Sequence, residues 1–191
     1  MKKGADGKIA AVILLVIVIS LFLGGPVLNL ADSIFRSSRM IPNRALEKEI
    51  MEYIGFTGDE LTPEDCVGIT ELCIVYAHRI TDLEGLQYFT DLERLYVRNS
   101  NLKDLSALSS LPNLDYLDLS FNKISDLSPL ANLPKLRQLM LVHNRVKDLS
   151  PISNIKSLRI VAIRLNPVAY NGDYSYLQEK NSRLEIWTEM P

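Results

Sequence analysis

The sequence predicts an α/β repeat fold (a solenoid): a short arc of stacked units with a parallel β-sheet on its concave face. A helical cap is expected before the arc, preceded in turn by one N-terminal transmembrane or signal helix. Three observations lead to this prediction. Residues 80–167 repeat four times with a 22-residue period, each repeat contains an alternating strand pattern, and each contains a short turn segment. Units this short cannot bury an apolar side alone, whereas stacked copies share one continuous core.

The predicted core consists of seven apolar columns that recur in all four repeats, giving 28 apolar sites. The first column is Ile80, Leu102, Ile124 and Val146, and the last is Val97, Leu119, Leu141 and Ile163. Each column is expected to stack along the arc, so that every repeat packs only against its neighbours.

The strands are predicted from the run Leu-x-x-Leu-x-Leu-x-x-Asn or a near copy of it, at residues 92–100, 114–122, 136–144 and 158–166. Apolar and polar residues alternate within it, which indicates a strand with one buried face. This run is the leucine-rich-repeat pattern. Asn122, Asn144 and Asn166 end their runs and are expected to bond the backbone of adjacent coils. Ser100 replaces asparagine in the first repeat and is expected to do so less well.

The return segments read Asp-Leu-Ser-Pro-Leu or similar, and Pro129 and Pro151 favour a turn or a single short helical turn. An aspartate column precedes a buried leucine in each segment: Asp82, Asp104, Asp126 and Asp148. We interpret these carboxylates as acceptors of local backbone N–H groups, in preference to metal ligands.

The period, the turns and the strand runs together resemble the internalin-type leucine-rich repeats of bacterial surface proteins. The flanks agree, because residues 41–54 and 61–65 resemble the helical cap of such arrays and residues 166–187 resemble their closing unit. The resemblance implies the fold and leaves the ligand open, since such arrays serve many binding roles.

The predicted organisation is a signal anchor or signal peptide at 1–31, a linker at 32–40, a helical cap at 41–68, repeats at 69–167 and a closing unit at 168–191. The first coil is irregular, because 23 residues separate Leu72 from Leu95. A 23-residue step is also expected at the other end, aligning Leu184 with Val161.

Residues 9–23 are apolar and uncharged, and the uncharged stretch extends to residue 31. This length approaches that of a membrane-spanning helix, although Pro26 is expected to end or kink it. Lys2, Lys3 and Lys8 precede it, which favours an uncleaved single-pass anchor with the repeats outside the cytoplasm. The alternative is a cleaved signal peptide and a secreted protein.

Composition limits the classes of function. The net charge is −2, and about −4 beyond residue 31, which argues against nucleic-acid binding and gives no reason to expect attraction to anionic lipid. Two histidines and no catalytic or phosphate-binding motif argue against an enzyme, a cofactor or a metal site. Cys66 and Cys73 are expected to remain unpaired, the first buried and the second facing outward.

The candidate ligand-binding surface is the concave strand face, where the third, fifth and seventh residues of each run point away from the core. Tyrosine, arginine, methionine and tryptophan are enriched at interfaces, and they recur here. The candidate residues are Arg94, Tyr96, Arg98, Tyr116, Asp118, Met140, Val142, Arg164 and Trp187. Phe121, one place beyond this face, is expected to pack at the convex turn.

The sequence therefore predicts a membrane-tethered, extracytoplasmic binding module that recognises a protein or cell-wall ligand. The alternative is an intracellular scaffold or regulator, similar to the phosphatase-regulating proteins with 22-residue repeats. A structural spacer that works through its convex side is a third interpretation.

Overall fold

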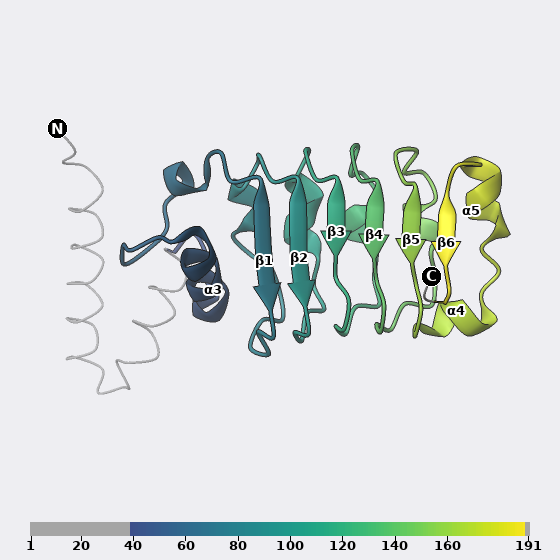
Figure 1. The fold of residues 1–191 in the computed structure, drawn as a ribbon, viewed down its shortest axis with the longest axis horizontal. Coiled ribbons are helices and arrows are strands. Elements are labelled where there is room, and N and C mark those ends of the chain that lie inside the picture. The colour runs from purple at the N-terminus through teal and green to yellow at the C-terminus, as the bar shows by residue number, and fades with distance from the viewer. Residues whose placement is uncertain (1–38, 190–191) are drawn as a thin grey trace, which may run out of the picture.

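Six parallel strands form one sheet in chain order, β1-β2-β3-β4-β5-β6, in a computed structural model that describes residues 39–189. The strands are β1 (Glu71–Val75), β2 (Arg94–Arg98), β3 (Tyr116–Asp118), β4 (Gln138–Met140), β5 (Ile160–Ala162) and β6 (Glu185–Trp187). Figure 1 shows them side by side in a single layer, with short helical turns behind. The predicted α/β solenoid is thus the observed architecture.

From β1 to β5, each coil returns on the convex side through a 3-10 helical turn. These turns are η2 (Leu86–Tyr88), η3 (Ser106–Ser110), η4 (Ser128–Leu130) and η5 (Ser150–Ile152). Proline at the start of η4 and of η5 suits the first positions of a helical turn, where an N–H has no partner to lose. The turn is short because the next strand must begin one sheet spacing further along the arc.

The core between the sheet and the turns consists of the predicted columns, and all 28 sites are at most 5% exposed. Complete burial of stacked leucine columns is the main source of stability in a fold whose units contact only their neighbours.

The asparagine column joins each coil to the one before it. The Asn144 side-chain oxygen accepts the Ile124 N–H at 3.0 Å, while its nitrogen donates to the Leu119 and Leu141 carbonyls at 2.9 and 3.1 Å. Asn122 and Asn166 repeat this arrangement. Ser100 is buried but bonds only the carbonyl of Arg98, which confirms that it replaces asparagine incompletely.

The two irregular steps have different outcomes. Leu72 pairs with Leu95, so the 23-residue first step is confirmed. At the other end Val161 pairs with Ile186, a step of 25 residues, so the predicted alignment of Leu184 with Val161 is wrong. The helices α4 (Pro167–Asn171) and α5 (Ser175–Lys180) replace the single turn of earlier coils and take up the additional residues.

At the other end of the arc, helix α3 (Arg44–Ile54) lies beside β1, and η1 (Pro63–Cys66) connects it to the sheet. Asn43 caps α3 by accepting the Ala45 and Leu46 N–H groups, and Gly55 ends it with φ of 68°. Leu46 and Ile50 are fully buried and extend the core past the first coil.

The predicted membrane segment, residues 1–31, and most of the predicted linker lie outside the described residues. Within residues 39–189, no helix has the length and apolar character needed to cross a bilayer. Cys66 is buried, Cys73 is partly exposed, and both are free thiols, as expected.

Candidate functional site

The concave face carries a cluster of tyrosine, arginine and carboxylate side chains on β1, β2 and β3. Arg94 pairs directly with Tyr116 across the strands, and Tyr96 pairs with Asp118. The rings of Tyr96 and Tyr116 meet on the diagonal, with centroids 5.0 Å apart and planes tilted by 36°. Such a diagonal contact lies within reach of aromatic side chains on adjacent strands.

Arg98 links this aromatic pair to a carboxylate. Its guanidinium carbon lies 5.5 Å from the centre of the Tyr96 ring, and its Nε donates to Asp118 Oδ2 at 2.6 Å. The Asp118 side chain is 5% exposed, and that of Arg98 is 42% exposed. Asp118 therefore holds Arg98 in place from beneath, and the cation and rings form the accessible surface.

The position of Asp118 corrects one predicted role. Its outward position on the strand suggested direct contact with a ligand, yet Oδ1 accepts the Ser120 N–H at 2.9 Å and Oδ2 is occupied by Arg98. Its carboxylate is thus covered by its own neighbours, and we assign Asp118 to the positioning of Arg98. The alternation along the strand predicts the direction of a side chain, but it does not predict whether a neighbouring side chain covers it.

A second ion pair continues the cluster towards α3. Arg94 Nε donates to Glu71 Oε2 at 2.6 Å, and the Tyr53 hydroxyl donates to Glu71 Oε1 at 3.3 Å. The hydrogen bond from Arg94 lowers the pKa of Glu71, so this carboxyl stays ionised. Tyr53 is not predictable from the sequence, because nothing in the strand pattern indicates that α3 reaches this face.

Burial raises the pKa of Tyr116, and the adjacent Asp118 carboxylate raises it further. Burial and then Glu71 likewise raise the pKa of Tyr53. Both phenols therefore remain protonated near neutral pH. The Tyr53 hydroxyl already donates to Glu71, so the cluster offers a ligand two cations and the paired rings of Tyr96 and Tyr116 on a preformed surface.

The remaining predicted residues lie further along the face. Met140 pairs with Ala162 and, on its other side, with Asp118, while Val142 and Arg164 follow the ends of β4 and β5; all three are partly exposed. Trp187 lies beside Ala162 and not beside Arg164, because of the 25-residue step. One cluster thus contains Arg94, Tyr96, Arg98, Tyr116 and Asp118, and Met140 extends it. The other three candidates, Val142, Arg164 and Trp187, lie further along the concave face.

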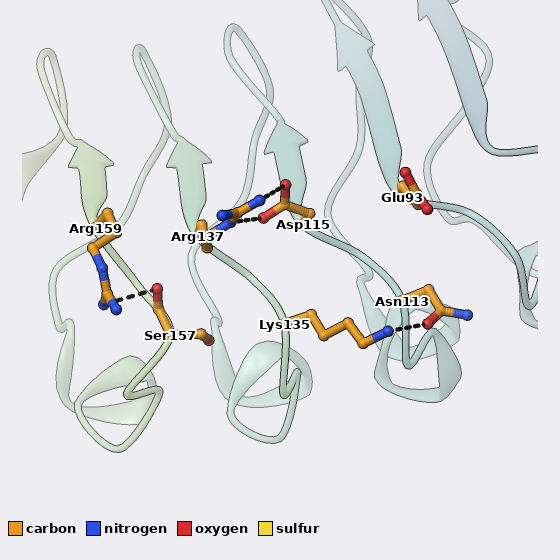
Figure 2. Close-up of a pocket in the computed structure, with 7 residues that line it drawn as sticks. All are labelled: Glu93, Asn113, Asp115, Lys135, Arg137, Ser157 and Arg159. Atoms are coloured by element: carbon orange, nitrogen blue, oxygen red, sulfur yellow. Dashed lines mark hydrogen bonds and ion pairs between the residues drawn. The ribbon is translucent and has the colours of Figure 1, made fainter.

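Another polar surface lies where the strands begin, and Figure 2 shows its side chains. Arg137 forms two hydrogen bonds with Asp115 at 2.6 and 2.9 Å, and Lys135 donates to Asn113 at 2.7 Å. Arg159 donates to three consecutive backbone carbonyls. Arg137 and Lys135 thus bond the preceding coil and Arg159 bonds its own, so we regard this hollow as a set of structural contacts and the tyrosine cluster as the better candidate.

The aspartate column acts as predicted. Asp104, Asp126 and Asp148 each accept the N–H of the serine two residues later at 2.8 Å. Hydrogen bonds from that serine lower the pKa of all three carboxyls.

Comparison with known proteins gives one match to a family and several to solved folds. The family described as "Leucine Rich repeats (2 copies)" matches residues 90–132 and 112–154. No curated protein matches the sequence. A crystal structure of internalin C2 from Listeria monocytogenes is 23% identical, covers 76% of this chain and 82% of its own, and gives a TM-score of 0.50.

Two further structures resemble the chain over a smaller part of their own length. An internalin (inlF) from Listeria monocytogenes is 23% identical over 78% of this chain and 56% of its own, with a TM-score of 0.45. A plant ice-binding protein is 22% identical over 66% of this chain and 51% of its own, with a TM-score of 0.50. At these identities the likeness to internalin C2 and to the plant protein shows the fold.

Proposed function

We propose that this internalin-type leucine-rich-repeat protein is a membrane-tethered binding module that holds a protein ligand on its concave face outside the cytoplasm. The observation that supports this proposal best is the ordered cluster of Tyr96, Tyr116 and Arg98. Tyrosine and arginine supply much of the binding energy at interfaces, because they bury large surfaces and still form hydrogen bonds.

The cluster is ordered before any ligand arrives. Asp118 and the ring of Tyr96 restrain Arg98, Glu71 restrains Arg94, and the two rings restrain each other. A surface whose side chains are already held loses little conformational entropy on binding. Met140, beside Asp118 in the sheet, adds a partly exposed apolar side chain to the same surface.

The site can be tested by photocrosslinking in intact cells, with a photoreactive amino acid at Met140. We expect Tyr96→Ala or Tyr116→Ala to reduce the crosslinked product by about tenfold, the effect of losing one strong contact residue. Tyr88→Ala is the matched control, since Tyr88 is 42% exposed on the convex turn η2, and it should leave the product unchanged.

Stability distinguishes a binding role from a structural one. Each tyrosine variant should lose only about 1 kcal/mol of unfolding free energy, the contribution of one aromatic contact. If crosslinking falls equally with Tyr88→Ala, the concave face is not the binding surface. A large loss of stability in the tyrosine variants would mean that those rings belong to the core. A product that is digested by a wall hydrolase and resists protease would identify a cell-wall polymer in place of a protein.

The tether is supported by the uncharged residues 9–31 and the lysines that precede them. Protease added to intact cells should remove a tag placed after residue 191. If the tag survives in intact cells and is lost only after lysis, the repeats are cytoplasmic and the intracellular scaffold is the correct alternative.

A further inference from the structure

One backbone position has a positive φ in five consecutive coils, at the edge of the sheet where the strands end (beyond the arrowheads in Figure 1). The residues are Tyr76, Asn99, Phe121, His143 and Leu165, with φ of 62°, 51°, 61°, 57° and 57°. The first four donate their N–H groups to a carbonyl of the next coil at 2.7–3.2 Å. The fold therefore requires a left-handed turn at this place in each coil.

Three of the five residues at this place do not suit the turn. Left-handed backbone favours glycine, asparagine and histidine, and other large side chains are strained there, so Asn99 and His143 fit while Tyr76, Phe121 and Leu165 do not. Tyr76 is nevertheless 70% exposed, Phe121 44% and Leu165 40%. Phe121 also stacks on His143, with ring centroids 5.3 Å apart. Phe121 is thus not packed at the convex turn as predicted; with Tyr76 and Leu165 it forms an exposed apolar row along this edge.

Cations border the apolar row on both sides. Arg79, Lys123 and Arg145 each directly precede a buried residue of the first core column. Lys103 and Lys147 lie two positions after that place in their coils. Arg164 lies on the other side, at the end of the concave face. Within residues 39–189 none of these six forms an ion pair. The nearest acidic column begins the convex side, and Asp104, Asp126 and Asp148 in it bond their own turns.

We propose that this edge is a membrane-contact surface that rests on a bilayer containing anionic phospholipid. Aromatic and apolar tips enter the interface between headgroups and acyl chains, while lysine and arginine remain at the level of anionic headgroups. A fluid bilayer accommodates an irregular protruding row, whereas a folded partner would need a matching groove. The whole chain has a negative net charge and is not attracted to anionic lipid. The attraction arises because the unpaired lysine and arginine side chains lie together at this edge.

This inference goes beyond the proposed ligand site. Contact through the strand ends would place the sheet upright on the membrane, with the cluster of Tyr96 and Tyr116 facing sideways and open to a ligand. The contact would fix the orientation of the concave face, which a tether alone leaves free.

The test uses the full chain in vesicles whose phosphatidylcholine is brominated on the acyl chains, with or without one-third phosphatidylglycerol. Trp187, the single tryptophan, is replaced by phenylalanine, and Phe121→Trp introduces one indole in the row. We expect the lipid bromines to quench this indole when phosphatidylglycerol is present. Lys135→Trp, at the opposite edge of the sheet, should give an indole that is not quenched. Leu165→Trp supplies a second reporter if the Phe121 variant does not fold.

Charge variants test the electrostatic part. Lys123→Glu combined with Arg145→Glu should reduce quenching of the indole in the row by about half or more. Lys135→Glu combined with Lys156→Glu changes the net charge equally at other positions and should leave quenching unchanged.

Three results would overturn the proposal. They are an unquenched indole in the row, quenching that is equal with and without phosphatidylglycerol, and equal effects of the two charge pairs. If soluble polyglutamate shifts the emission of this indole while brominated lipid does not quench it, the edge takes an acidic polypeptide and the lipid assignment is wrong.

Discussion

Single buried side chains close the coils of this protein, and the asparagine column is the clearest case. Each amide satisfies backbone groups that are buried between two coils, and alanine leaves those groups without partners. We expect Asn144→Ala to lower the unfolding free energy by about 3 kcal/mol in urea titrations. Ser100→Ala, where the side chain forms one weak bond, should lower it by less than about 1 kcal/mol. Equal losses would mean that the amide network contributes no more than a single hydroxyl.

The two thiols should differ in reactivity. Burial, with smaller contributions from the Asp65 and Glu64 carboxylates, raises the pKa of Cys66 to about 11, so almost no thiolate forms at pH 8. Cys73 is partly exposed on the concave face. Under native conditions a thiol reagent should therefore label one cysteine per chain, and in denaturant two. Labelling of both in the folded protein would contradict the buried position of Cys66.

The convex turns are the elements whose stability should respond to acid. Asp104, Asp126, Asp148 and Asp173 each accept hydrogen bonds from the serine two residues later, which lowers the pKa of each carboxyl below its usual value of 3.8. A carboxyl with a lowered pKa stabilises the folded state above pH 3.8, and this contribution is lost as the pH falls below that value.

We therefore expect the urea midpoint to fall between pH 4 and pH 2. A variant with asparagine at 104, 126 and 148 keeps an acceptor for the backbone N–H and has no carboxylate to protonate there. Its midpoint should change less over the same range. An identical change in both proteins would show that other carboxyls govern acid unfolding.

At the scale of the whole molecule the arc is a stack of equivalent coils, so its length is variable in steps of one period. Deleting residues 123–144 joins Asn122 to Arg145 and preserves every column. We expect a cooperatively folded five-stranded protein whose urea m-value is lower by roughly a seventh, since less surface is exposed on unfolding. Deleting residues 123–133 removes half a period and should abolish cooperative unfolding. If both deletions behave alike, the coils are not interchangeable.

The repeat, the strand face, the buried columns and the first irregular step were all predictable from the sequence. Because the period is fixed, equivalent residues stack on one another, and the structure predicted for one coil applies to its neighbours. The closing unit was predicted less well, because beyond Asn166 there is no repeated column to set its register. The contribution of Tyr53 from α3 also lies outside the period.

The sequence by itself determined which residues face inward and which face outward, since strand alternation and the period fix direction. Only the tertiary structure decided what the outward residues do. It buried Asp118 beneath Arg98, placed the Tyr96 and Tyr116 rings in contact, and brought Phe121 and His143 from separate coils into one exposed row. The physical reason is that exposure and pairing depend on neighbours about 22 residues away, and their side chains differ from coil to coil.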